Sequence, residues 1–259
     1  MASKIGWAAA TVIIVILSVA VITYYFGIIN PPSPVTGQLK TPTDQADLNW
    51  AGYTAVYSLS DPKPLVTGVS GSWVVPQVQI SQNDTYSAVW VGIGGFFGHS
   101  LIQTGTEQDS VGGTVQYFAW YELLPSDEVV IASMAVSSGD EITASISLEN
   151  SVLNIWSIRI SDLTTGQSFI QDLYYNSSRL SAEWVVERPD VNNSISELVN
   201  FGNVTMQNCS VTVNNEIGAF GYFPSVRLFM YDMNGTRLSD VSYYTNNGSN
   251  FTVRYLASR

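Results

Sequence analysis

From residue 49 onward, short segments dense in Val, Ile, Tyr, Trp and Thr alternate with clusters of Gly, Asn, Asp and Ser. This part of the chain has no convincing helical periodicity and no visible repeat of about 20–50 residues, which argues against a propeller or solenoid. Many strands at close spacing, with turn residues between them, predict an all-β sandwich or barrel. We therefore expect residues 49–259 to form one large antiparallel β domain.

Alternation along the predicted strands separates side chains by face. In "AEWVVE", Trp184 and Val186 are typical of a core, so Glu183 and Glu187 point to the opposite face. Two interpretations are open: these glutamates are solvated on an outer surface, or they line a concave sheet, where burial without partners is costly. In two other segments, alternation places a group of side chains on one face of the predicted strand. These are Leu101, Gln103, Gly105 and Glu107 in "LIQTGTE" and Phe118, Trp120 and Glu122 in "FAWYE".

The N-terminal pattern is different, because residues 5–29 carry no charge. At about 1.5 Å per residue, this length crosses a hydrocarbon core of about 30 Å with some tilt. A cleaved signal peptide is the alternative, but its apolar core is normally only about 7–15 residues long. We expect residues 1–29 to be an uncleaved signal-anchor, or transmembrane, helix with Lys4 inside the cell. Residues 30–48 are then a Pro/Thr-rich linker, and the β domain is extracellular, or secreted if the helix is cleaved.

Charged residues make up 12% of the chain, about half of the usual share of roughly 25%. The chain contains ten Lys and Arg residues and twenty-one Asp and Glu residues, which gives a net charge of −11. Such a surface repels phosphate, so nucleic acid is excluded as a partner. Few basic groups also limit self-repulsion once carboxylates are protonated, which fits an acidic environment outside the cell.

Potential glycosylation sites support the extracellular placement. Eight asparagines begin an N-x-S/T triplet without a central proline: Asn83, Asn176, Asn192, Asn203, Asn208, Asn234, Asn247 and Asn250. A chain rich in Asn, Ser and Thr contains some triplets by chance, but eight fit a glycosylated exterior better.

The single cysteine and single histidine restrict the possible chemistry. Cys209 cannot form an internal disulfide, and we interpret it as a buried packing residue. His99 lies in the Gly-rich stretch "GGFFGHS" and is the only histidine for a Ser-His-Asp or Cys-His site. The chain has no G-x-S-x-G motif, and one histidine cannot build a His-rich metal site. We expect no cofactor and no metal.

Six segments occur in a characteristic order: "NWAGY", "GSWVVPQ", "VWVGIGG", "LIQTG", "AWYE" and "AEWVVE". Each is weak alone, but together they resemble the glutamic peptidases, the eqolisin family of acid endopeptidases. The resemblance covers Asn49 to about Phe201 and is less clear beyond. It implies a concanavalin-like (jelly-roll type) sandwich of two curved antiparallel sheets and polypeptide substrates. It also implies that Gln103 of "LIQTG" and Glu187 of "AEWVVE" are the catalytic pair.

The segment "LIQTG" looks like an aspartic-protease signature with Gln103 in place of the carboxylate. Under the resemblance, Glu187 activates water and later protonates the leaving amine, while the amide of Gln103 stabilises the oxyanion. We expect the two residues on adjacent strands of the concave sheet, with one water between them. The acid limb of activity should then lie near a glutamate's ordinary pKa of about 4.3, or lower if neighbours donate hydrogen bonds to the carboxylate.

Other matched positions support this site. Trp50 and Trp90 match tryptophans that line the family's cleft, although each alone would more often be a core residue. Glu122 matches a family carboxylate near the site, and Glu107 stands where the family can carry an aspartate. Glu183, the first glutamate of "AEWVVE", is included with these residues.

One position departs from the family's pattern: "WVGIDG" reads "WVGIGG" here, so Gly94 replaces a carboxylate of the site's hydrogen-bond network. This departure keeps open an inactive or lectin-like surface-binding sandwich. A glycoside hydrolase is the other alternative, because Glu183 and Glu187 have the spacing of an E-x-D-x-E strand. Four residues of regular strand separate them by about 13 Å, however, and glycosidases use roughly 5–9.5 Å.

Overall fold

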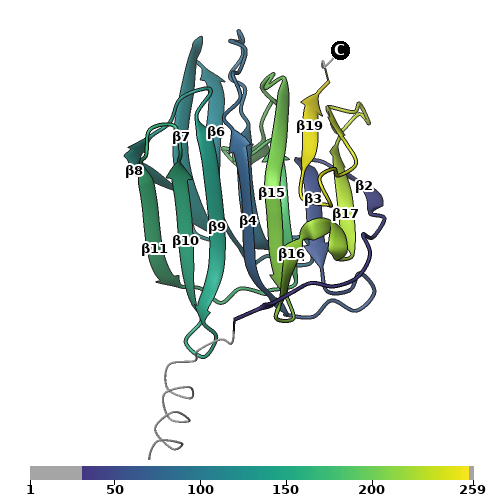
Figure 1. The fold of residues 1–259 in the computed structure, drawn as a ribbon. Helices are drawn as coiled ribbons and strands as arrows, with labels where there is room; N and C mark the ends of the chain where they lie inside the picture. Colours follow the sequence, from purple (N-terminus) through teal and green to yellow (C-terminus); the bar gives the residue numbers. More distant parts are fainter. Residues whose placement is uncertain (1–30, 257–259) are drawn as a thin grey trace, which may run out of the picture.

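The computed structural model describes residues 31–256, which form two β-sheets packed face to face (Figure 1). The nine-stranded sheet has the order β1 (Ser33–Pro34), β16 (Glu216–Ala219), β15 (Asn203–Val213), β4 (Val66–Val74), β9 (Glu141–Asn150), β10 (Ile155–Asp162) and β11 (Ser168–Tyr174), with β19 (Phe251–Tyr255) beside β15 and β18 (Ser239–Val241) beside β19. The eight-stranded sheet has the order β2 (Thr43–Asp47), β17 (Ser225–Met230), β3 (Trp50–Val56), β12 (Ser181–Glu187), β5 (Ala88–Gly94), β6 (Leu101–Val111), β7 (Thr114–Leu123) and β8 (Val129–Ala135). The predicted all-β sandwich is confirmed.

Little structure lies outside these two sheets. A short ribbon pairs β13 (Asp190–Val191) with β14 (Ser194–Ile195), and among residues 31–256 the single helix is a 3-10 turn, η1 (Phe220–Tyr222). Within each of the two sheets, neighbouring strands pair antiparallel. The exceptions are β1 with β16 and β2 with β17, which pair parallel. The Leu124–Pro125 peptide bond is cis.

The core fills the space between the sheets with large aromatic and aliphatic side chains. Trp73, Trp156 and Trp184 are fully buried there. Two of them also link the sheets by hydrogen bonds, because Trp184 Nε1 on β12 donates to the carbonyl oxygen of Ser70 at 2.7 Å and Trp73 Nε1 on β4 donates to Oγ1 of Thr106 at 3.0 Å. Satisfying these buried donors avoids a desolvation cost of about 1–3 kcal/mol each.

Strand β12 has the two faces that its alternation predicts. Trp184 and Val186 belong to the core, whereas Val185 packs on the other face of the sheet. Glu183 and Glu187 share the face of Val185, but neither lies on an open outer surface: Glu183 is fully buried and Glu187 is half-buried. Solvated glutamates on an outer face are therefore excluded. Cys209 is buried in the core, as its interpretation as a packing residue predicts.

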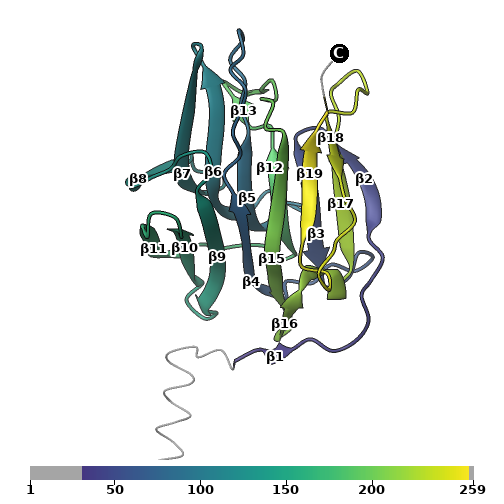
Figure 2. The same cartoon turned by 45° about the horizontal axis from the view of Figure 1, so that its top comes forward.

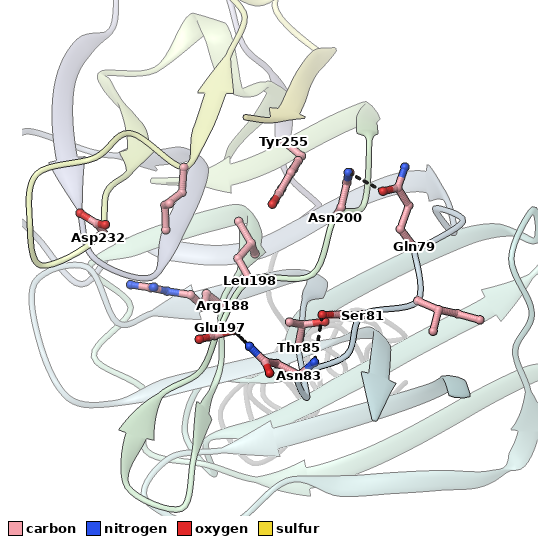
Figure 3. Close-up of a pocket in the computed structure, with 12 residues that line it drawn as sticks. Gln79, Ser81, Asn83, Thr85, Arg188, Glu197, Leu198, Asn200, Asp232 and Tyr255 are labelled. Atoms are coloured by element: carbon pink, nitrogen blue, oxygen red, sulfur yellow. Dashed lines mark hydrogen bonds between the residues drawn. The ribbon is translucent and has the colours of Figure 1, made fainter. Parts of the chain in front are cut away.

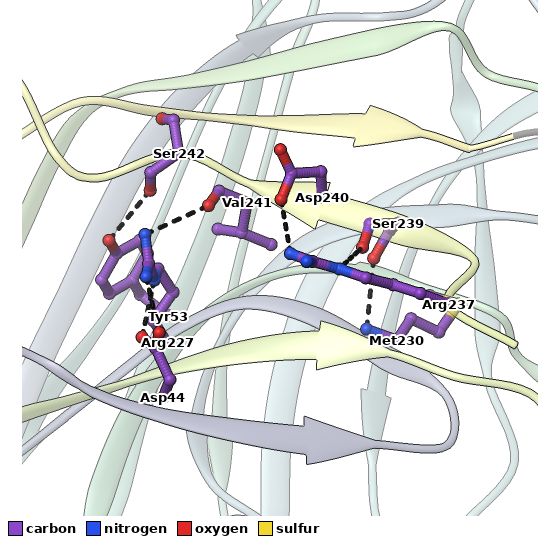
Figure 4. A network of polar contacts seen from close by, with 9 residues as sticks. All are labelled: Asp44, Tyr53, Arg227, Met230, Arg237, Ser239, Asp240, Val241 and Ser242. Carbon is purple, nitrogen blue, oxygen red and sulfur yellow. Dashed lines mark hydrogen bonds and ion pairs between the residues drawn. The ribbon is translucent and has the colours of Figure 1, made fainter. Parts of the chain in front are cut away.

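The described part of the predicted linker, residues 31–48, runs along the β domain and contributes strands β1 and β2. Figure 2 shows β1 beneath β16, with the chain then rising along the edge to β2. Arg227 of β17 holds β2 through two hydrogen bonds to Asp44, of 2.8 Å and 2.7 Å (Figure 4). The guanidinium also lies 3.8 Å from the ring centroid of Tyr243. These contacts attach β2 to the edge of the eight-stranded sheet.

The predicted membrane span falls outside the described residues. Between residues 31 and 256, no helix is long and apolar enough to cross a membrane. Seven of the eight sequon asparagines are exposed, and the eighth, Asn250, is half-buried.

Candidate active site

A second cluster of apolar side chains covers the other face of the eight-stranded sheet, away from the core. It contains Ala88, Trp90, Leu101, Trp120 and Val185, with Trp50, Phe118 and Leu124 packed against them. Above this cluster lies a cavity of about 540 Å³. Its lining includes five of the residues that the sequence singled out: Trp50, Gln103, Glu107, Glu122 and Glu187. Trp90 contributes to the floor beneath it.

Strand register fixes where these side chains sit. Glu187 lies opposite Ala88, which lies opposite Glu107, so the two glutamates occupy one cross-strand row. Gln103 lies four positions along β6 from Glu107, opposite Gly92 on one side and Glu122 on the other. Because β5 separates β12 from β6, the expectation that Gln103 and Glu187 occupy adjacent strands is wrong.

Two glycines make room for the indole of Trp90 in this floor. A Cβ on Gly92 would lie 2.8 Å from the Trp90 ring, and a Cβ on Gly105 would lie 2.6 Å from the Trp90 Cβ. With both positions open, the ring lies against the sheet and its edge meets Trp50, with centroids 5.1 Å apart and planes at 78°. Trp90 is thereby held in one orientation, which an aromatic pair of this geometry favours.

Glu187 receives hydrogen bonds on both carboxyl oxygens. Trp90 Nε1 donates to Oε2 at 2.7 Å, and the side-chain amide of Asn49 donates to Oε1 at 3.0 Å. Burial raises the pKa of Glu187 to about 7, and hydrogen bonds from Trp50 and Trp90 oppose this rise. The carboxyl is thus fixed in position and becomes a base close to neutral pH. Sequence reasoning missed Asn49, although it begins the "NWAGY" segment.

Gln103 is oriented by Glu122 on the neighbouring strand. Its Nε2 donates to Oε2 of Glu122 at 2.5 Å, while its Oε1 is buried without a hydrogen-bond partner. Burial raises the pKa of Glu122, and the hydrogen bond from Gln103 opposes that rise. One N–H of the Gln103 amide is thus engaged by Glu122.

Glu107 and Asp109 form a pair of buried carboxyls on β6, with exposed fractions of 6% and 5%. The two carboxyls lie close enough to shift each other's pKa, and the backbone N–H of Ser87 donates to Asp109 at 3.2 Å. Burial is the main cause that raises the pKa of Glu107 well above its ordinary value, and the charge of Asp109 adds to it. Burial also raises the pKa of Asp109 to about 6. The alternation that groups Gln103 with Glu107 also includes Asp109, so the signal was present in the sequence.

The cavity is acidic throughout. Seven carboxyl side chains line it: Glu107, Asp109, Glu122, Asp127, Glu128, Glu187 and Asp190. Its lining contains no Lys, Arg or His. Burial raises the pKa of Glu128 to about 7 as well. Burial thus raises the pKa of five of the seven carboxyls, namely Glu107, Asp109, Glu122, Glu128 and Glu187.

Comparison with known proteins decides the family. Residues 48–255 match the model of the Peptidase A4 family. The chain belongs to this family of glutamic peptidases, and it is a hydrolase of peptide bonds. Aspergillopepsin-2 of Aspergillus niger is 27% identical over 241 residues, which span 83% of this chain and 80% of that protein.

Solved structures of glutamic peptidases have the same fold. Scytalido-glutamic peptidase with a transition state analog inhibitor superposes with a TM-score of 0.68, at 23% identity over 81% of this chain and 99% of that one. Aspergilloglutamic peptidase from Aspergillus niger gives a TM-score of 0.59, at 26% identity over 66% of this chain and 99% of that one. The two-sheet β-sandwich implied by the family resemblance is thus observed.

Glu183 does not lie with the other glutamic-peptidase residues at the cavity. It is fully buried and contributes nothing to the lining, because residues of the Gly-rich loop after β5 lie close to its carboxyl. The nearby N–H of Phe96 and hydroxyl of Ser181 both donate to the carbonyl oxygen of Gly94, at 2.8 Å and 2.7 Å. Neither oxygen of Glu183 has a hydrogen-bond partner, and burial raises its pKa well above the ordinary value. Glu183 therefore lies away from the cavity lining, unlike Glu187, and its expected supporting role stays a prediction.

Gly94 is required by the backbone of this chain. Its φ of +107° is a conformation that only glycine adopts readily, and a Cβ there would lie 2.1 Å from the carbonyl oxygen of Ser100. The aspartate of the family's "WVGIDG" segment therefore does not fit here. The absence of that carboxylate follows from the path of the loop.

A second cavity, of about 600 Å³, lies between the loops around Gln79 and Glu197 (Figure 3). Its polar lining is held by hydrogen bonds from Asn200 to Gln79 and from Asn83 to Glu197. None of the predicted site residues lines it. Within residues 31–256, no group of three or more His, Cys, Asp or Glu side chains is arranged to hold a metal ion.

Proposed function

We propose that this protein is an extracellular acid endopeptidase in which Glu187 activates water and Gln103 stabilises the oxyanion. The observation that carries the proposal is that Glu187 and Gln103 line one cavity, each fixed by a neighbour. Trp90 and Asn49 orient the carboxyl, and Glu122 orients the amide. Such preorganisation is what electrostatic stabilisation of a tetrahedral intermediate requires.

Glu187 is suited to the role of general base. In its ionised form it accepts a proton from the attacking water, and the hydrogen bonds of 2.7 Å and 3.0 Å keep its orientation. A base whose pKa lies near the working pH is the most effective one. Because burial raises the pKa of Glu187 to about 7, the acid limb of activity should lie above the value of about 4.3 expected for an ordinary glutamate. The working range is thereby displaced from strongly acidic pH towards neutral pH.

Gln103 cannot exchange protons usefully, but its free N–H can donate to the oxygen that becomes negative. An oxyanion donor of this kind contributes about 2.7–4 kcal/mol to the barrier, or roughly 10²–10³ in turnover. Because the amide is neutral, it adds no negative charge that would raise the pKa of Glu187 further. Glu122 supports the role by engaging one N–H of the amide and so fixing its direction.

The proposed location is the cell surface, with residues 1–29 as the membrane anchor and the sandwich outside. The uncharged stretch of residues 5–29 and the exposure of seven sequon asparagines support this placement. Brief protease treatment of intact cells should release the domain, and mass spectrometry should find glycans on the exposed asparagines. A domain that stays protected on intact cells and is cut only after lysis would contradict the topology.

The deciding experiment compares the full chain with Glu187→Gln on denatured protein substrates between pH 2 and pH 8. Glu187→Gln retains the side-chain volume but removes the base, so hydrolysis should fall to background while the circular dichroism spectrum is unchanged. Gln103→Ala should lower turnover by roughly 10²–10³. EDTA, thiol reagents and serine-directed phosphonates should have no effect. Full activity in Glu187→Gln would refute the assignment, and hydrolysis of glucans but not proteins would favour a glycosidase.

A further inference from the structure

The Glu107–Asp109 pair is a feature of the cavity wall that the proposed mechanism does not use. Both side chains line the cavity, both are more than nine-tenths buried, and they lie close enough to shift each other's pKa. A hydrogen bond between two carboxyl groups needs a proton, because two carboxylates have only acceptors. Two carboxyls buried this close together favour one shared proton over two negative charges.

The pair is placed opposite the base. Glu187 and Glu107 occupy the same cross-strand row, and only Ala88 lies between them. Two strand spacings separate their Cα atoms by about 10 Å, and the methyl group of Ala88 leaves the space between the two carboxyls open to the cavity. Gln103, by contrast, is displaced from this row by four positions. Glu107 is thus the carboxyl on β6 that faces Glu187 most directly.

One oxygen of Glu107 also lacks a hydrogen-bond partner within the protein. Its Oε2 is buried and has no hydrogen-bond partner, although the side chain lines the cavity. Two other glutamates are less suited to this role. Glu122 already accepts a hydrogen bond from Gln103, and Glu183 does not line the cavity. Gly94 supplies no carboxyl at all.

We propose that Glu107, sharing a proton with Asp109, is the general acid that protonates the leaving amine, while Glu187 acts only as the base. The inference rests on the proposed function of the site. It divides between two carboxyls the proton transfers that a single glutamate would otherwise perform in sequence. It also gives Asp109 a role, as the positioning residue that keeps the proton on Glu107.

The proton and electron balance of the reaction is complete. Glu187 takes a proton from water as the water oxygen bonds to the scissile carbonyl carbon, and the carbonyl electron pair moves to the oxygen beside Gln103. When the C–N bond breaks, its electron pair stays on nitrogen, which receives the proton of Glu107. The carbonyl reforms, and the products are an acid and an amine. Transfer of the proton from Glu187 to the Glu107–Asp109 pair through solvent restores the enzyme.

The surroundings keep this proton in place. The titratable groups that face Glu107 are Asp109 on its own strand, Glu187 across the row, Glu128 before β8 and Tyr86 before β5. None of them is a cation, so each ionised neighbour opposes the loss of the proton. Burial acts in the same direction and raises the pKa of Glu107 well above its ordinary value. Both effects favour the protonated acid at a pH where an ordinary glutamate is ionised.

The test uses the full chain, a peptide substrate and a nitrophenyl ester with the same acyl sequence. An amine leaving group must be protonated as it departs, whereas nitrophenolate departs as an anion. Glu107→Gln should therefore lower kcat/KM on the peptide by about 10²–10⁴ and have a far smaller effect on the ester. Equal losses on both substrates, or no loss on the peptide, would overturn the proposal. Glu187→Gln should abolish hydrolysis of both, so failure of the proposed function gives a different result.

Asp109→Asn provides a second readout if Glu107→Gln does not fold. Removing the Asp109 charge and adding an amide donor lowers the pKa of Glu107, so the alkaline limb of the pH profile should move to lower pH. The acid limb, which reports Glu187, should move much less. Asp172→Asn on exposed β11 removes the same charge far from the cavity lining and is the control. An alkaline limb that stays in place in Asp109→Asn would contradict the role of the pair.

Discussion

Trp90 Nε1 donates a hydrogen bond of 2.7 Å to Oε2 of Glu187, from the strand directly beside that of Glu187. The donor stabilises the ionised carboxylate, while burial of the same group favours the protonated acid. The two effects oppose each other, and burial is the larger. This balance sets the pH at which the proposed base becomes active.

Trp90→Phe tests the balance, because it retains most of the ring but removes the N–H. Loss of a hydrogen bond to a charged group should raise the pKa of Glu187 further, by about one unit. Activity needs ionised Glu187, so the acid limb of kcat/KM should move to higher pH by that amount. The measurement is a pH profile of both proteins, with thermal unfolding to confirm that the fold remains. An unmoved acid limb would show that the indole does not tune the base.

Gly94→Asp tests whether the missing family carboxylate can be restored. The φ of +107° and the approach of 2.1 Å to the carbonyl oxygen of Ser100 predict that it cannot. Strain of this kind costs of order 1–3 kcal/mol per residue, so the denaturant midpoint should fall and activity should not rise. Gly98→Asp, in the loop that follows β5, is the matched control, since a Cβ at Gly98 meets nothing within 4 Å. A more active and equally stable Gly94→Asp would contradict this reading of the loop.

The sequence predicted the sandwich and the faces of its strands because burial imposes a period of two on the residues. Trp184 and Glu187 were assigned to opposite faces correctly for this reason. It could not predict that β5 lies between β12 and β6, because strand order depends on contacts that local patterns do not encode. The separation of Gln103 from Glu187 by a whole strand was missed for that reason.

The burial of Glu183 by a loop could not be predicted from the sequence either. Glu183 and Glu187 have the same local pattern, and only the path of the Gly-rich loop closes one of them off and leaves the other at the cavity. Asp109, by contrast, follows from simple alternation along β6 and needed no tertiary information. The family resemblance identified Gln103 and Glu187 but gave no reason to look beyond Glu107.

The edge strand β2 leads to a prediction about the limits of the folded domain. Residues 43–47 pair with β17, and Asp44 binds Arg227, whose side chain is only 9% exposed. A chain that begins at residue 48 loses this strand and leaves the Arg227 guanidinium without its carboxylate. It should therefore unfold at lower temperature than a chain that begins at residue 31. Equal melting temperatures would show that the domain does not need β2.

Arg227→Lys separates the two parts of this effect. Lysine keeps the charge but cannot form the two parallel hydrogen bonds to Asp44, nor stack on the ring of Tyr243 in the same way. The chain from residue 31 should lose part of its thermal stability with this substitution. The chain from residue 48 should lose less, because its Asp44 is already absent. Equal losses in both chains would assign the role of Arg227 to its aromatic contacts alone.

Glu183 gives the protein a pH-dependent stability of predictable sign. Burial raises the pKa of Glu183 well above its ordinary value in the folded state. Both states are protonated in strong acid, so Glu183 has no effect on the slope there. Above about pH 4.3, the unfolded chain releases this proton while the folded chain retains it. The unfolded state then binds fewer protons than the native state, and the free energy of unfolding falls as the pH rises towards the folded pKa.

Glu183→Gln should remove this dependence, because the amide is neutral at every pH. For one group the slope is about 1.4 kcal/mol per pH unit between the two pKa values, so the wild-type protein should lose stability between pH 5 and pH 7 relative to the variant. Urea midpoints at pH 4, 5, 6 and 7 measure the difference. The Glu183→Gln curve should be flatter and should lie above the wild-type curve at pH 7, although Glu107 contributes a slope of the same sign in both proteins. Parallel curves would mean that Glu183 ionises in the folded state without penalty. In that case the loop after β5 would have to admit water to its carboxyl.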